Sequence, residues 1–75
     1  MKIIQGLTLE ESIRKRLIEA IKLSGKSQKE IAKMTKIKDA TLSDYIHKGK
    51  FPSIITFALL CNALDVSSDE ILGLK

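Results

Sequence analysis

Residues 27–45 read SQKEIAKMTKIKDATLSDY, and this stretch decides the fold. It opens with Ser27 followed three residues later by Glu30, a capping box in which each side chain satisfies a backbone N–H at the start of a helix. Two runs of apolar residues at helical spacing follow, one ending near Met34 and the other near Lys48. We therefore expect two short helices joined by a turn of about three or four residues and packed at a steep angle.

Capping and termination signals on either side of this stretch predict three further helices. A second capping box, at Thr8 and Glu11, opens a helix that ends at Gly25. A fourth helix follows Ser53, and a short fifth helix precedes Gly73. The expected fold is all-α, a compact five-helix domain over residues 1–75, with an N-terminal arm at 1–7, the paired helices at 27–48 and the C-terminal helices at 53–75.

The charge of this 75-residue chain is +4 and is unevenly distributed. Residues 22–50 hold eight lysines and three acidic residues, a net charge of +5, whereas residues 51–75 carry a net charge of −2. A positive middle third that coincides with the paired helices points toward a polyanionic partner. A solvated lysine-rich surface gives the same composition, so charge alone leaves both readings open.

The inventory of reactive residues excludes several classes of protein. One cysteine, Cys61, and one histidine, His47, permit neither an intrachain disulfide nor a multi-cysteine zinc site. We expect Cys61 to be a buried structural thiol and His47 to lie at the surface. No run approaches the roughly 18 apolar residues of a membrane span, so we expect a soluble cytoplasmic protein. The chain has no phosphate-binding loop and no nucleophile–base pair, and we expect no enzyme, metal, cofactor or small-molecule substrate.

The order and spacing of these signals resemble the lambda-repressor-like (Cro/CI, XRE-type) helix-turn-helix DNA-binding family. The resemblance covers about residues 13–73. It implies a sequence-specific transcriptional regulator, a phage-type repressor that binds a short operator in double-stranded DNA as a homodimer. The pieces that carry it are Ser27-Gln28 with Ile31-Ala32, Ile37 with Thr41-Leu42-Ser43, Gly49-Lys50 with Pro52-Ser53, and residues 63–67 with residues 69–73.

The resemblance also implies which residues meet DNA. The second of the paired helices lies in the major groove, where an aspartate can accept a hydrogen bond from cytosine N4. Asp39 has another possible role, because Lys38 is a poor cap and an acid stabilises a helix start. The positions implied to face bases are Lys38, Asp39, Ala40, Thr41 and Asp44, and those implied to meet the sugar–phosphate backbone are Ser27, Gln28, Lys29, Ser43, His47, Lys48 and Lys50.

The sequence departs from the family pattern at several positions. Lys36 stands where the turn usually has glycine, so this lysine must adopt a positive φ or the turn must be built differently. Ile21 and Ile46 replace a common arginine–glutamate pair, and we expect them to pack against each other. We expect the basic run at residues 14–16 to be a solvated helix face.

The expected fourth helix is apolar nearly all round, which predicts a covered surface. The N-terminal arm could cover it within one chain, through Ile3, Ile4 and Leu7. A partner subunit could cover it instead, and we expect this homodimer surface to comprise Ile55, Leu59, Ile71, Leu72 and Leu74. The alternative function is a protein–protein interaction module with little or no DNA binding, in which the apolar helix binds a different partner.

Overall fold

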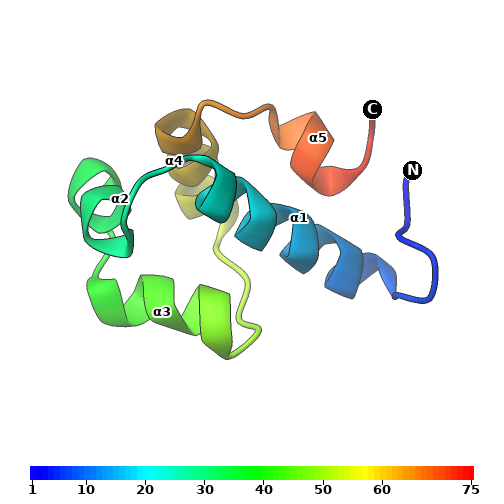
Figure 1. The fold of residues 1–75 in the computed structure, drawn as a ribbon, viewed down its shortest axis with the longest axis horizontal. Helices are drawn as coiled ribbons and strands as arrows, with labels where there is room; N and C mark the ends of the chain where they lie inside the picture. The colour runs from blue at the N-terminus through cyan, green and yellow to red at the C-terminus, as the bar shows by residue number, and fades with distance from the viewer.

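The computed structural model describes residues 1–75 and contains five α-helices and no strand, as predicted. In Figure 1, α2 and α3 lie at one end of the molecule, and both chain termini lie at the other end, beside α5 and the start of α1. The molecule measures 33 × 23 × 22 Å along its principal axes. The helices are α1 (Leu9–Leu23), α2 (Gln28–Thr35), α3 (Asp39–His47), α4 (Ile54–Leu64) and α5 (Ser68–Leu72).

The helix ends follow the predicted capping signals. Thr8 and Ser27 both form complete capping boxes, with Glu11 and Glu30 respectively. The Ser53 hydroxyl accepts a hydrogen bond from a backbone N–H in the first turn of α4, and Ser67 caps α5 in the same way. Each cap satisfies backbone donors that have no partner inside the helix, and the start of each capped helix lies within one or two residues of its predicted position.

All five helices contribute to a single hydrophobic core. Ile31, Leu42 and Leu60 are completely buried, and they bring α2, α3 and α4 together. Helix α4 packs against α2, while α5 packs against α1. The inner faces of α2 and α3 therefore pack against the rest of the domain. The buried core residues are Leu17, Ile21, Ile31, Ala32, Leu42, Leu60, Cys61, Leu64 and Ile71.

The N-terminal arm is fastened to α1 and to the end of α5. The backbone N–H of Lys2 donates to the carbonyl of Gly73 at 2.6 Å, and the Arg16 guanidinium donates to the carbonyl of Lys2. The backbone N–H of Ile4 donates to the hydroxyl of Ser12 at 2.9 Å. The arm does not cover α4, because Ile55 remains 73% exposed. Of the two covers considered for this helix, the arm is therefore excluded.

Candidate nucleic-acid interface

The turn between α2 and α3 is built around a left-handed lysine. Lys36 has φ 59° and ψ 21°, so it adopts the positive φ that its position requires. The buried hydroxyl of Thr35 donates to the carbonyl of Ile31 at 2.7 Å and accepts from the N–H of Ile37 at 3.3 Å. Thr35 was not among the predicted site residues. The signal that could have identified Thr35 is a threonine directly before a left-handed residue. Its hydroxyl can form hydrogen bonds with backbone groups that precede and follow it in the chain.

Gln28 connects the beginnings of α2 and α3. Its Nε2 donates to the carbonyl oxygen of Asp39 at 3.3 Å. Lys38, the N-cap of α3, makes no side-chain capping bond, and Asp39 lies in the first turn, where a negative charge is favourable. The Gln28 amide thus fixes the position of the α3 N-terminus relative to α2, and its carbonyl oxygen makes no hydrogen bond within the chain.

The start of α3 presents its predicted base-facing residues outward. Lys38, Asp39 and Ala40 are exposed, and Thr41 is half-buried. Leu42, on the opposite side of the helix, is completely buried in the core. The first turn of α3 therefore forms a ridge of small and polar side chains, which is the shape that a major groove admits.

Asp44 differs from the other predicted base-facing residues because it is paired. Its Oδ1 lies 3.6 Å from Nζ of Lys48, and its Oδ2 lies 3.6 Å from Nζ of Lys50. The Asp44 side chain is 28% exposed, whereas those of Lys48 and Lys50 are 72% and 66% exposed. Both carboxylate oxygens are thus committed to ammonium groups at the C-terminal end of α3.

The residues predicted to meet the DNA backbone lie at two places on the same pair of helices. The first group surrounds the start of α2, where the Ser27 hydroxyl accepts from the N–H of Glu30 and Lys29 is exposed. The second group surrounds the end of α3, where Ser43 is half-buried and His47 is exposed. Gln28 joins the first group to the start of α3, and the second group lies toward the other end of that helix. Backbone contacts at two such places would fix the orientation of the protein on duplex DNA.

Lysines dominate the charge around these helices. Two of the three acids of this region are occupied locally, because Glu30 closes a capping box and Asp44 is paired with two lysines, while Asp39 is exposed. The excess of positive charge therefore projects into solvent, where it attracts a polyanion over several ångströms. The exposed lysines of residues 22–50 are Lys22, Lys29, Lys33, Lys36, Lys38, Lys48 and Lys50.

The expected dimer surface is accessible at four of its five positions. Ile55 and Leu59 are 73% and 44% exposed on α4, and Leu74 is 55% exposed after α5. The prediction for Ile71 is wrong, because its side chain is 4% exposed and packs in the core. Leu72 is half-buried and lines an apolar hollow of about 390 Å³ together with Glu10, Ile13, Leu17, Phe51, Pro52, Ile54 and Phe57.

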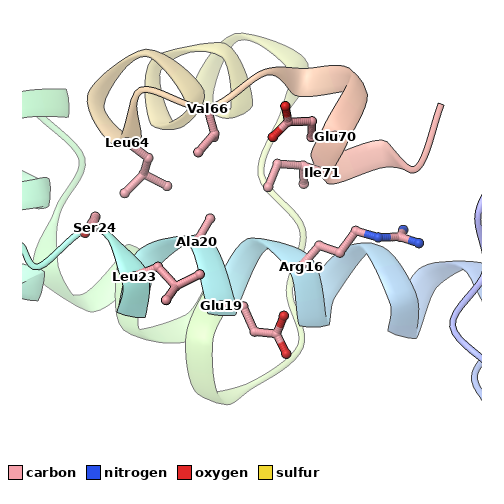
Figure 2. Close-up of a pocket in the computed structure, with 9 residues that line it drawn as sticks. All are labelled: Arg16, Glu19, Ala20, Leu23, Ser24, Leu64, Val66, Glu70 and Ile71. Atoms are coloured by element: carbon pink, nitrogen blue, oxygen red, sulfur yellow. The ribbon is translucent and has the colours of Figure 1, made fainter. Parts of the chain in front are cut away.

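A second hollow, of about 300 Å³, lies between α1 and the segment that joins α4 to α5. Figure 2 shows Ala20, Leu64 and Val66 around its middle, while the side chains of Glu19 and Arg16 extend away from it. The Arg16 guanidinium instead bonds the N-terminal arm, at the carbonyl of Lys2. The hollow is thus an apolar groove whose charged groups lie at its edges.

Cys61 and His47 lie in different surroundings. Cys61 is buried on α4, and burial raises the pKa of its thiol, so that the reactive thiolate is disfavoured. This agrees with a structural role. His47 is exposed in the last turn of α3. The chain contains no group of three or more metal-ligating side chains that could hold an ion.

The basic run of α1 is only partly a solvated face. Lys15 is exposed, but Arg14 donates from Nη2 to the carbonyl oxygen of Ile46 at 2.9 Å. Arg16 bonds the carbonyl of Lys2 in the N-terminal arm. The expectation is therefore wrong for both arginines, which tie α1 to segments distant in sequence. Spacing along a helix shows which face a side chain occupies but cannot show which carbonyl lies across from it.

Comparison with known proteins agrees with this geometry. The sequence model of the helix-turn-helix family, of the XRE or lambda-repressor-like type, matches residues 17–71. Because this match spans most of the chain, the protein belongs to the XRE-type helix-turn-helix family, a family of DNA-binding regulatory domains. No curated protein and no solved structure matched the chain. No helix has both the length and the apolar character needed to cross a membrane.

Proposed function

We propose that this protein is a cytoplasmic phage-type repressor that binds a short pseudo-palindromic operator as a homodimer. The observation that carries the proposal is the exposed first turn of α3, on a pair of helices whose other exposed side chains include an excess of lysines. Helix α3 enters the major groove, and Lys38, Asp39, Ala40 and Thr41 face the base edges. Sequence discrimination comes from this turn.

The phosphate contacts come from both sides of that turn. Ser27, Gln28 and Lys29 meet one strand at the start of α2, where helix N–H groups favour an anion. Ser43, His47, Lys48 and Lys50 meet the backbone at the other end of α3. These contacts carry no sequence information, and they make binding strongly dependent on salt.

The base-facing turn contains no arginine or glutamine, the residues that make the strongest bidentate base contacts. Lys38 can donate to guanine, and the methyl group of Thr41 can contact thymine. One domain therefore discriminates modestly. A second subunit doubles the base contacts and adds the requirement for two half-sites about one helical turn apart.

The dimer surface is formed by Ile55 and Leu59 of α4 with Leu72 and Leu74 near the C-terminus. Support comes from the exposure of the large apolar side chains of Ile55, Leu59 and Leu74, because exposed apolar surface of this kind normally marks a contact. Ile55→Glu should therefore give a monomer in sedimentation at micromolar concentration. Leu23→Glu is the matched control, because Leu23 is 86% exposed on α1 and lies outside the proposed surface. Sedimentation of the unmodified chain as a strict monomer would contradict the dimer.

A second function is favoured by the same apolar surface. A chain that uses Ile55 and Leu59 to bind a different protein would be an interaction module, with Asp39 reducing its affinity for DNA. Binding to random-sequence duplex distinguishes the two functions. A DNA-binding repressor loses about tenfold or more in affinity between about 50 and 200 mM salt. Absence of binding at about 50 mM salt would favour the interaction module.

The operator itself is found by selecting bound duplexes from a random pool. The proposal predicts that the selected sequences contain two inverted half-sites whose centres are about 10 base pairs, or a multiple of that, apart. Selection of single, unpaired half-sites would contradict the homodimeric mode of binding and leave DNA binding intact.

A further inference from the structure

Asp44 occupies an unusual position on a helix that faces DNA. Its two carboxylate oxygens each lie 3.6 Å from a different ammonium group, one on Lys48 and one on Lys50. An aspartate that reads cytosine needs at least one oxygen directed at the base edge. Here both oxygens face lysines that are among the proposed phosphate contacts, so base reading does not explain the arrangement.

The backbone around Asp44 holds the same two lysines. The carbonyl oxygen of Asp44 accepts from the N–H of Lys48 at 2.9 Å and from the N–H of Lys50 at 3.4 Å. Gly49, between them, has φ +71° and lets the chain reverse within this short turn. Asp44 therefore contacts both lysines in two ways. Its carbonyl oxygen accepts hydrogen bonds from their backbone N–H groups, and its carboxylate lies beside their ammonium groups.

Helix α1 also contacts and stabilises this turn. Arg14 bonds the carbonyl of Ile46, and a Cβ on Gly49 would lie 3.6 Å from its Nε. The backbone that carries Lys48 and Lys50 is therefore fixed in place. The freedom that remains is in the two lysine side chains, which can either stay on the carboxylate or reach a phosphate.

We infer that Asp44 is a positioning residue that acts through Lys48 and Lys50 and limits sequence-independent binding to DNA. The inference rests on the proposed DNA-binding function. Exposed ion pairs are weak, so a phosphate can compete for each lysine. While the pairs persist, however, the two lysines and the aspartate present one net positive charge. The protein thus makes fewer phosphate contacts on DNA of arbitrary sequence than its number of lysines would allow. The base-facing turn of α3 therefore contributes a larger share of the binding free energy.

The salt dependence of binding to random-sequence duplex tests this inference. Each additional phosphate contact steepens the plot of log affinity against log salt by about 0.9. Asp44→Asn should steepen it by about one contact and tighten binding at about 50 mM salt by about threefold to tenfold. In a Lys48→Gln/Lys50→Gln background, the same substitution should leave the slope unchanged.

Asp65→Asn is the matched control, because it removes one negative charge at an exposed residue that forms no ion pair and lies outside the proposed DNA-binding surface. It should leave the slope unchanged and alter the affinity by less than about twofold. Thermal unfolding followed by circular dichroism verifies that each variant is folded. A purely structural role for Asp44 would change the unfolding temperature and not the slope.

The possible outcomes separate this inference from the proposed function. If the unmodified protein binds duplex and Asp44→Asn has an unchanged slope, the inference is overturned and DNA binding stands. A steeper slope that persists without the two lysines also overturns it, as does a loss of preference at one base pair with the slope unchanged. If the unmodified protein binds no duplex at about 50 mM salt, the proposed function fails and the inference fails with it.

Discussion

Arg14 and Ile46 are 32 residues apart in sequence, and a 2.9 Å hydrogen bond joins the Arg14 guanidinium to the Ile46 carbonyl oxygen. The bond connects α1 with the last turn of α3, where carbonyl groups have no partner inside the helix and a positive charge is favourable. The Nε of Arg14 is buried and makes no hydrogen bond. Arg14 therefore braces the C-terminal end of the proposed recognition helix.

We expect Arg14→Met to lower the free energy of unfolding by about 1–2 kcal/mol, because a hydrogen bond to a charged donor is lost from a half-buried site. Urea unfolding measures the change. Lys15→Met is the control, because Lys15 is exposed and should change stability by less than about 0.5 kcal/mol. Equal effects of the two substitutions would show that the bond to Ile46 contributes nothing.

A second prediction concerns Gly73, whose carbonyl oxygen accepts a hydrogen bond from the N-terminal arm. A Cβ on Gly73 would lie 2.6 Å from the carbonyl oxygen of Lys2 and 2.8 Å from a guanidinium nitrogen of Arg16. Gly25 has a similar positive φ, but its Cβ would meet nothing within 4 Å. Gly25→Ala should therefore cost only the backbone strain of about 1–2 kcal/mol.

Gly73→Ala should cost about 1–3 kcal/mol more than Gly25→Ala, because it also displaces the arm. Chemical denaturation of the two variants side by side measures the difference. Proteolysis gives a second measurement, since displacement of the arm should expose residues near Lys2 to cleavage. Similar stabilities for the two variants would mean that the arm moves aside without cost.

The packing of Ile21 against Ile46 remains a prediction. Ile21 is buried in the core and Ile46 packs against the same cluster, so a direct contact is compatible with their positions. A double-mutant cycle with alanine at both positions should give a coupling energy of about 0.5–1 kcal/mol. The pair of Ile46→Ala with Val66→Ala, a residue of the connection between α4 and α5, provides the reference. Additive effects within about 0.3 kcal/mol would show that the two isoleucines do not interact.

The capping box at the start of α1 predicts a dependence of stability on pH. Hydrogen bonds from the backbone N–H and the hydroxyl of Thr8 lower the pKa of Glu11 below its ordinary value of 4.5. A carboxylate whose pKa is lowered in the folded protein contributes stability above its ordinary pKa, and this contribution is lost as the pH falls toward the lowered value. The unmodified protein should thus be more stable than Glu11→Gln at pH 7, and the difference should shrink below about pH 4.5.

Thermal unfolding between about pH 3 and pH 7 measures this difference. Glu10→Gln is the control, because Glu10 lies in the same turn and does not take part in the capping box. A stability difference for Glu11→Gln that is constant across this range would contradict the linkage.

The local signals in this sequence were sufficient to predict the helices. Thr8, Ser27 and Ser53 are short polar residues that satisfy the first N–H groups of a helix, and each caps the predicted one. The left-handed Lys36 was one of two outcomes expected from the resemblance, because the family usually has glycine at this position. These features depend on neighbours within about four residues, which is the range of a helical hydrogen bond.

Contacts between distant segments were not predictable from the same signals. Arg14 and Arg16 belong to a basic run that reads as solvated, yet each meets a backbone carbonyl brought close by tertiary packing. Ile71 was predicted to lie on the dimer surface, and it is instead part of the core. The Asp44–Lys48 pair has the i,i+4 spacing that a helix predicts, but the second pair, with Lys50, depends on the reversal of the chain at Gly49.

The central claim is that the outward face of α2 and α3 binds duplex DNA. The most direct test is the change in backbone amide chemical shifts when random-sequence duplex is added to the labelled protein at about 50 mM salt. We expect the largest changes at residues 27–29 and 38–50, and we expect these changes to disappear when the salt is raised. Changes confined to α4 and the C-terminal residues, or no changes at all, would contradict it.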